Sequence, residues 1–246
     1  MIQIEEKTEN VKGKLGQEEL DFVKVDDGWI SIFGIDVKKN PGKYSLSINM
    51  GEEKFEREIT VIKRNFPITE LYVSKELEKK GCTRQKIREN IAKKDNPSIY
   101  QILEIYTPTS YFDKSFTYPL NEIKVVGAYG NIRKEGEVQL QHLGVDLDAE
   151  VGIPVYAVND GVVCFTEDLI NYGKTLIIDH GLGIYSLYLH LNSFNVEKDQ
   201  KVKMDDIIGF SGNTGYSIAP HLHFSIKVNG ASVDPLRFIK TTSENW

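Results

Sequence analysis

The sequence predicts a mainly β protein, with a small β-sandwich at the N-terminus and an antiparallel β-domain with an open groove at the C-terminus. Two observations predict this fold: short apolar segments separated by turn signals, and the lack of any strand–helix–strand alternation. With 246 residues the chain is long enough for two domains. We place the sandwich at residues 1–73, a helical connector at 74–110 and the second β-domain at 111–246.

The sandwich is predicted from closely spaced strands. The segments LDFVKV (20–25) and GWISIFGI (28–35) are separated by Asp26 and Asp27, which are a turn signal. In YSLSINM (44–50) every second residue is apolar, which is typical of a half-buried strand. Several such strands within the first 73 residues favour a small sandwich of the immunoglobulin-like kind.

The connector is predicted to contain one helix. Thr83 can cap its start, and Ile87 and Ile91 lie four residues apart on one face. The run Asp95-Asn96-Pro97 predicts its end. We expect this segment to link and position the domains and to carry no chemistry.

The second domain is predicted from six strands, without intervening helices. Asp160-Gly161 is a hairpin turn signal, and the two glycines of HGLG (180–183) permit a second tight turn. This pattern favours an antiparallel sheet. The candidate strands are 154–158, 161–166, 174–180, 184–190, 206–212 and 221–228.

Charge is unevenly distributed along the chain. Residues 1–110 hold 19 Lys and Arg against 19 Asp and Glu, whereas residues 111–246 hold 11 against 17 and carry the whole net charge of −6. A protein that binds duplex nucleic acid usually presents a basic surface, so we expect no nucleic-acid partner. No apolar run approaches the roughly 18 residues of a transmembrane helix. The first residues, MIQIEEKTEN, lack the basic and apolar regions of a signal peptide.

All five histidines lie in the second half of the chain. In QHLGVDLDAE (141–150), His142 and Asp146 are four residues apart, which puts both side chains on one face of an extended segment. Their Cα atoms would then be ~13 Å apart. Because this is too far for one metal ion, a shared site requires a bend at Gly144. Imidazole and carboxylate are both zinc ligands.

The segment HLHFSIKV (221–228) holds two more histidines. Residues two apart in a strand point to the same face, so His221 and His223 would lie side by side. Such pairs also occur in strands that bind no metal, and His190, at the end of IYSLYLH (184–190), also fits an ordinary surface position. These histidines, His142 and Asp146 all fall at strand ends or turns of one β-domain, which favours a metal site. From the residues alone both interpretations stay open.

The segments HLGVD, YLHL and PHLHF, in this order, resemble the signature of the M23 family of zinc metallopeptidases, the LytM and lysostaphin-type peptidoglycan endopeptidases. The stretches GIPVYAVNDGVV, YGKTLIIDHGLG and VNGASVDPLRFI are also similar to that family, so the resemblance covers roughly residues 125–239. More weakly, DDGWISIFGIDVKKNPGKYSLSI resembles the β-sandwich domain that precedes the peptidase in some members.

The resemblance implies a role for five residues. His142 and Asp146 of the HxxxD motif and His223 of the HxH motif would be the three protein ligands of one Zn²⁺ per chain. His190 and His221 would flank the water that zinc activates, one as general base and the other stabilising the developing oxyanion. Zinc lowers the pKa of its water toward ~7, and histidine exchanges protons near neutral pH.

By the same resemblance, residues 111–246 form an M23-type peptidase domain, and the protein is a zinc metalloendopeptidase that cleaves peptide cross-links of bacterial peptidoglycan. Its partners would be stem peptides or cross-bridges outside the cytoplasm, so we expect export to the periplasm, cell envelope or medium by a signal that this sequence does not include. The alternative is a catalytically silent, LytM-like protein that binds the cell wall or activates other hydrolases. The presence of all five residues favours the enzyme.

Two further expectations concern the surroundings of the site. His180, in the hairpin DHGLG, is expected to be structural. The segment 108–135, which holds Asn121 and Asn131, could cover the zinc and keep the enzyme latent.

Overall fold

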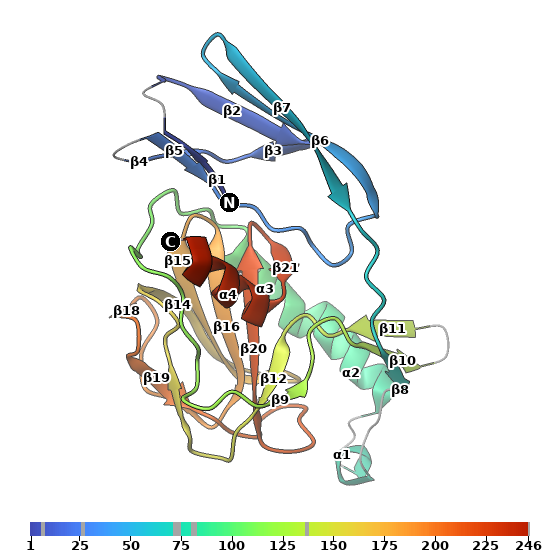
Figure 1. Ribbon diagram of the computed structural model, residues 1–246. Coiled ribbons are helices and arrows are strands. Elements are labelled where there is room, and N and C mark those ends of the chain that lie inside the picture. Colours follow the sequence, from blue (N-terminus) through green and yellow to red (C-terminus); the bar gives the residue numbers. More distant parts are fainter. Residues whose placement is uncertain (6–7, 26–27, 71–74, 80–82, 136–137, 246) are drawn as a thin grey trace.

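The computed structural model describes residues 1–5, 8–25, 28–70, 75–79, 83–135 and 138–245; the turn predicted at Asp26 and Asp27 lies outside these ranges. The predicted mainly β fold is confirmed, with antiparallel sheets in both halves of the chain. Figure 1 shows a smaller N-terminal part above a larger sheet that belongs to the C-terminal half. No helix in the described ranges is long and apolar enough to cross a bilayer.

The N-terminal part is a sandwich of two antiparallel sheets, as predicted. One sheet has the order β1 (Ile2–Ile4), β5 (Gly28–Ser31) and β4 (Val23–Val25), and the other has the order β3 (Glu18–Leu20), β2 (Val11–Leu15), β6 (Gly42–Met50) and β7 (Glu53–Val61). The alternation predicted for β6 is confirmed, because Leu46 and Ile48 are buried whereas Ser45 and Asn49 are exposed. These two apolar residues join the core between the sheets, with Ile4, Val11 and Leu15.

One long helix follows the sandwich, and the end predicted for it is wrong. It runs through α2 (Arg84–Asn90), a π-helical segment (Ile91–Asp95) and α3 (Asn96–Leu103), after a short α1 (Lys75–Lys79). Thr83 caps it as predicted, since its hydroxyl accepts a hydrogen bond from the backbone N–H of Lys86. Pro97 does not stop the helix because it falls in the first turn of α3, directly after the π-helical segment, where a backbone N–H is dispensable.

The C-terminal part is built on an eight-stranded antiparallel sheet. Its order is β18 (Lys201–Val202), β14 (Gly161–Leu169), β15 (Gly173–Gly181), β16 (Ile184–Leu191), β20 (His221–Val228), β12 (Val145–Asp148) and β9 (Val125–Gly127), and β21 (Ala231–Val233) also pairs with β20. A separate sheet has the order β13 (Pro154–Tyr156), β19 (Ile207–Phe210) and β17 (Ser193–Phe194). The HGLG turn joins β15 to β16 as predicted. The hairpin predicted at Asp160-Gly161 is wrong, because this stretch connects β13 and β14, which belong to different sheets.

The two faces of the large sheet are covered differently. On one face, Leu222, Phe224 and Ile226 of β20 belong to the main core, which also includes Phe116 and Ile239 of the C-terminal helix α4 (Pro235–Asn245). On the other face, Ile99 and Leu103 of α3 pack against Tyr185, Leu187 and Leu189 of β16. This second face stays open over β20 and β12.

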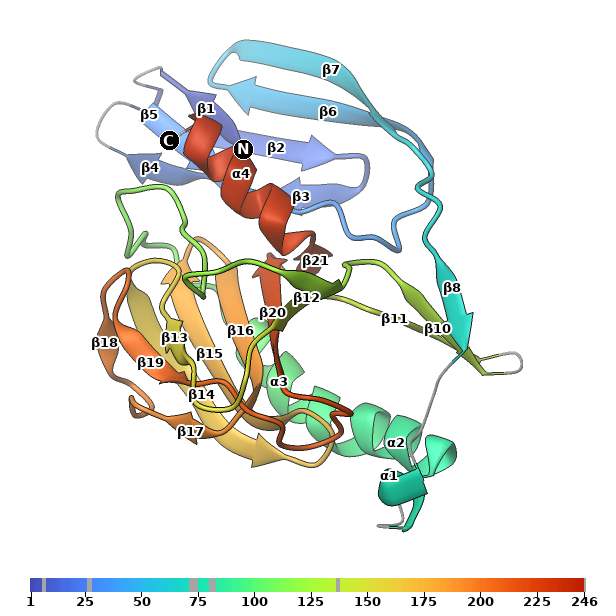
Figure 2. The ribbon, with the colours of Figure 1, turned by 60° about the horizontal axis from the view of Figure 1, so that its bottom comes forward.

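A third sheet borders the open face. It has the order β11 (Val138–Gln141), β10 (Ile132–Glu135) and β8 (Ile68–Glu70), with β8 parallel to β10. In Figure 2 this sheet lies on one side and the helix α2–α3 on the other, with β20 and β12 between them. The strand β8 falls within the range predicted for the sandwich domain yet pairs with β10; the domain boundaries stay a prediction.

Candidate metal centre

Three side chains that lie far apart in the sequence converge on β12, β20 and the segment before β12. His142 Nε2 lies 3.0 Å from Asp146 Oδ1 and 3.0 Å from His223 Nδ1, and the last two atoms are 2.8 Å apart. The strand register brings the pair together, because Asp146 lies directly opposite His223. A tetrahedral Zn²⁺ with bonds of about 2.0–2.1 Å holds its ligand atoms about 3.3 Å apart, so this donor set fits the ion.

A bend at Gly144 brings His142 to Asp146, as the spacing requires. Residues 142–144 lie outside any strand, between β11 and β12, with the bend at Gly144. A Cβ at position 144 would lie 2.3 Å from Ser225 Oγ and 2.6 Å from His223 Nε2. Glycine is therefore needed here for close packing, a requirement that the sequence analysis missed.

Hydrogen bonds orient the three side chains. His142 Nδ1 lies 2.8 Å from the carbonyl oxygen of Ala128; because that oxygen can only accept, Nδ1 carries the proton and Nε2 presents its lone pair. His223 Nε2 lies 3.0 Å from Ser225 Oγ, which leaves Nδ1 for the centre. Arg133 of β10 donates to the second oxygen of Asp146 over 3.2 Å. Sequence analysis missed Arg133, because only the tertiary fold brings β10 beside β12.

His221 and His190 lie beside these three residues. The ring centroids of His190 and His221 are 4.9 Å apart, and His221 Nε2 is 3.6 Å from Asp146 Oδ1. Each Nδ1 lies 2.8 Å from a backbone carbonyl oxygen, that of Ala219 for His221 and that of Thr214 for His190. Each Nδ1 therefore donates, and each neutral ring keeps its acceptor at Nε2.

A bulge in β16 places His190. The strand pairing shifts between Leu176 opposite Tyr188 and Lys174 opposite Leu191, so β16 holds one extra residue there. His190 has a φ of 62°, a left-handed conformation that non-glycine residues rarely adopt and that clusters at functional sites. Strict alternation would put His190 on the core face with Tyr188, and the bulge breaks it.

The pKa values of the cluster suit metal binding. Burial, followed by the charges of His221 and His223, lowers the pKa of His190 to about 3. Burial also lowers the pKa of His223 to about 4, although Asp146 opposes it. Burial raises the pKa of Asp146, but hydrogen bonds with His142 and His223 outweigh this and hold it far below its ordinary value. Neutral imidazoles and an ionised carboxylate are the forms that bind metal.

A groove of about 820 Å³ opens over the cluster. Its floor includes Leu187 and Leu189 of β16 and the groove-facing side chains of β20, and one wall is the helix α2–α3. The connector helix is thus part of the groove as well as a link between the two β-rich parts. The residues of this helix that line the groove are Ile87, Ile91, Asn96, Ile99, Tyr100 and Leu103.

The helix is also tied to the backbone that holds His190. Both carboxylate oxygens of the buried Asp95 accept hydrogen bonds, from the backbone N–H of Ile170 over 3.2 Å and from that of Asn171 over 2.7 Å. The next residue, Tyr172, accepts from the backbone N–H of His190 over 2.9 Å. The helical wall of the groove and the backbone of His190 are therefore both hydrogen-bonded to the turn at residues 170–172.

The remaining expectations concern residues outside the cluster. His180 is fully buried on the core face, in agreement with a structural role. The Asn121 side chain donates to the Tyr156 hydroxyl over 3.3 Å, and Asn131 contacts His142 through the backbone. In the segment considered for latency, Arg133 is the residue whose side chain reaches the cluster.

The sequence of this part of the chain matches a known family. Residues 140–235 match the sequence model of peptidase family M23, and the matched range contains all five predicted site residues. This segment of the chain is similar to peptidase family M23. The family comprises zinc-dependent peptidoglycan endopeptidases, which are hydrolases.

Two curated relatives show how far the similarity extends. The M23 segment is 39% identical over 103 residues to the DD-carboxypeptidase/endopeptidase Mpg of Neisseria meningitidis, covering 42% of this chain and 24% of the relative. It is also 39% identical over 107 residues to lysostaphin of Staphylococcus staphylolyticus, covering 41% of this chain and 22% of that protein. The chain thus spans about a quarter of the length of these relatives.

A solved structure extends the likeness to the whole fold. A structure from Pseudomonas aeruginosa, described as a peptidase M23, superposes with a TM-score of 0.63 over 95% of this chain and 89% of its own chain. The two sequences are 22% identical. The similarity therefore concerns the fold, and it includes the N-terminal β part.

Proposed function

We propose that this chain is a zinc-dependent endopeptidase that hydrolyses peptide cross-links in bacterial peptidoglycan. The observation that carries the proposal is the convergence of His142 Nε2, Asp146 Oδ1 and His223 Nδ1 within 3.0 Å of one another on the floor of an open groove. The match of residues 140–235 to the M23 family supports the substrate class. A peptide in the groove would run over these residues.

One Zn²⁺ per chain would be held by His142, Asp146 and His223. Three protein ligands are the number found in catalytic zinc sites, which keep a further position open. When bound, the ion lowers the pKa of a water and polarises a carbonyl group. The Arg133 guanidinium would hold the outer oxygen of Asp146, which leaves the inner oxygen for the metal.

His190 and His221 would handle the protons. Each keeps its Nδ1–H on a backbone carbonyl, so each Nε2 faces the centre as a proton acceptor. One of them would take the proton of the attacking water and deliver it to the leaving amine, and the other, when protonated, would donate to the oxygen that gains charge. Their fixed orientation limits the reorganisation that this exchange requires.

The proposed substrate lies in the cell wall, so the chain would act outside the cytoplasm. A groove whose walls are helix α2–α3 and strand β10 suits an extended peptide better than a bulky folded partner. We therefore propose stem peptides or cross-bridges as the groups bound there.

The test uses the full chain loaded with zinc. Zinc per chain is measured by mass spectrometry of the metal, and purified peptidoglycan is digested and its muropeptides are analysed by mass spectrometry. We expect about one zinc per chain and new peptide termini. The control is His223→Ala, which should yield neither.

A folded, zinc-loaded chain that leaves the muropeptides unchanged would contradict the proposal. The catalytically silent binding or activator protein would then become the better description.

A further inference from the structure

The strand that carries His221 and His223 continues along the groove to a buried lysine. His221, His223, Ser225 and Lys227 alternate with core residues on β20 and all line the groove. Lys227 lies four residues beyond His223, about 13 Å along an extended strand. Only 8% of its surface is exposed, which is rare for a lysine without an ionic partner.

Lys227 has few partners for its charge. Its ammonium donates to Ser232 Oγ, and no carboxylate in the described ranges lies within ion-pair distance of it. Asp36, whose charge acts on Lys227, already accepts hydrogen bonds through both oxygens, from the backbone N–H groups of Lys38 and Ser232 at 2.8 Å each. An ammonium has three donors, so two of them have no partner among these residues.

A second lysine lies at the same end of the groove. Lys38, which belongs to the segment after β5, lines the groove together with Lys227 and is exposed. Burial lowers the pKa of Lys227 to about 8, and the charge of Lys38 adds to this effect whereas Asp36 opposes it. An anion bound by both ammonium groups would compensate the charge that burial disfavours at Lys227.

The charges along the groove differ in how they are paired. At the metal end, Asp146 is paired with Arg133 over 3.2 Å and Asp148 with Lys124 over 2.6 Å. Four residues further along β20, Lys227 has no ion pair among the described residues. A peptide with an acidic group on one side of the cleaved bond would bind in one direction only.

We propose that Lys227 and Lys38 form a carboxylate-binding subsite that positions an acidic group of the peptide substrate about four extended residues from the metal centre. This inference rests on the proposed peptidase function, because a peptide substrate supplies anions as carboxylates. Lys227 is the buried, oriented donor, and Lys38 is the exposed cation contributed by the N-terminal part of the chain. The N-terminal segment thereby takes part in selecting the substrate.

The test measures binding rather than cleavage. Synthetic cross-linked stem peptides are prepared with each carboxylate either free or amidated, one at a time, and titrated calorimetrically into the metal-free full chain. We expect one particular amidation to weaken binding by about ten- to hundredfold, as for loss of a charge-assisted hydrogen bond. Lys227→Met and Lys38→Met should remove that preference, and Lys227→Arg should retain most of it.

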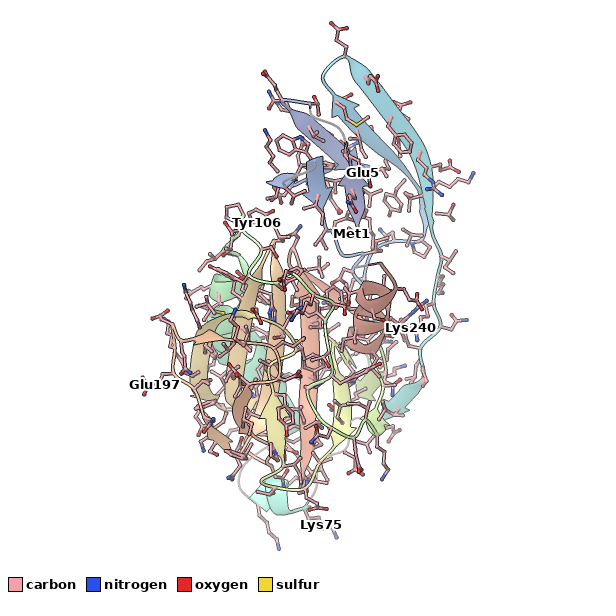
Figure 3. The ribbon with its side chains drawn as sticks, turned by 60° about the vertical axis from the view of Figure 1, so that its left-hand side comes forward. Met1, Glu5, Lys75, Tyr106, Glu197 and Lys240 are labelled. Atoms are coloured by element: carbon pink, nitrogen blue, oxygen red, sulfur yellow. The ribbon has the colours of Figure 1, made fainter. Side chains whose placement is uncertain are left out.

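Lys240→Met is the matched control. Lys240 projects from the exposed side of α4, as Figure 3 shows, and forms an ion pair with Glu244 at 3.9 Å. Its loss should leave the preference unchanged. Lys38→Met keeps the test decisive should Lys227→Met fail to fold, because Lys38 is exposed. The subsite is refuted if no single amidation weakens binding, or if the Lys38 and Lys227 variants lose affinity equally for free and amidated peptides.

The outcomes separate the two proposals. A chain that prefers the free carboxylate but leaves peptidoglycan uncut retains the subsite and loses the peptidase function. A chain that cuts peptidoglycan without any preference for the free carboxylate retains the function and loses the subsite.

Discussion

The two faces of the large sheet hold buried histidines in contrasting surroundings. On the core face, His180 Nδ1 lies 2.7 Å from the carbonyl oxygen of Asp160, His180 Nε2 lies 2.7 Å from Ser186 Oγ, and the ring packs against Phe116. On the groove face, His223 uses one nitrogen for Ser225 and turns the other toward His142 and Asp146.

Burial alone does not distinguish these histidines. It lowers the pKa of both His180 and His223 to about 4, so a perturbed pKa would mark either as functional. The difference lies in the hydrogen-bond partners of the ring nitrogens. Both nitrogens of His180 are hydrogen-bonded to core groups, whereas Nδ1 of His223 points toward two other potential metal ligands beside a groove. The convergence of several potential ligands beside an open groove is therefore a better criterion for a functional site than a perturbed pKa.

The largest expected effect comes from removing a groove-face ligand. His223→Ala should reduce zinc from about one per chain to nearly none, because two ligands hold the ion far less tightly than three, and activity should vanish with it. Metal analysis after dialysis measures this. If this variant retained zinc at full stoichiometry, His223 would not be a metal ligand, and the proposed difference between His223 and His180 would be wrong.

A smaller loss is expected from His190→Ala. This variant should keep its zinc and lose roughly 10²- to 10⁴-fold in turnover, the range for loss of a general acid or base. Metal analysis and muropeptide release are measured on the same preparation. Loss of zinc here would mean that His190 is a ligand and that the three-ligand assignment is wrong.

Gly144→Ala tests the backbone that supports the site. The added Cβ would collide with Ser225 and His223, so we expect a loss of about 1–3 kcal/mol in the free energy of unfolding and weaker zinc binding. Gly152→Ala is the control, because Gly152 has a φ of 94° but no atom within 4 Å of an added Cβ. Equal zinc affinity in both variants would contradict a steric requirement for glycine at position 144.

The effect with the least consequence for zinc binding is a pH dependence on the core face. The folded state holds the pKa of His180 near 4, below the unfolded value of about 6.5, so the unfolded state binds the extra proton between these values. Stability should therefore fall as pH drops from 6.5 to 4, by up to about 3 kcal/mol from this group. Chemical denaturation of metal-free wild type and His180→Gln measures it.

In that comparison His180→Gln should lose less stability than wild type over the same pH interval, and it should still bind zinc at neutral pH. Identical slopes for the two proteins would show that His180 does not differ in protonation between the folded and unfolded states. Loss of zinc by a folded His180→Gln would show that the core face of the sheet affects zinc binding on the groove face.

Much of the fold follows from local patterns. The alternation in YSLSINM predicts β6 and its buried face, and HLHFSIKV predicts β20 with the same bounds as the structure. The helix beginning at Thr83 follows from its cap. Its end does not, because the π-helical segment lets the chain accept Pro97, and Asp95 anchors that segment through contacts with residues about 75 positions away.

The sequence by itself determined which residues could form the centre. A period of two puts His221 and His223 on one face of a strand, and the HxxxD spacing demands a bend at Gly144. Tertiary structure decided the rest: the register that sets Asp146 opposite His223, the bulge that turns His190 toward the groove, and the approach of Arg133, Lys38 and the connector helix. These depend on contacts between distant segments, which no local periodicity encodes.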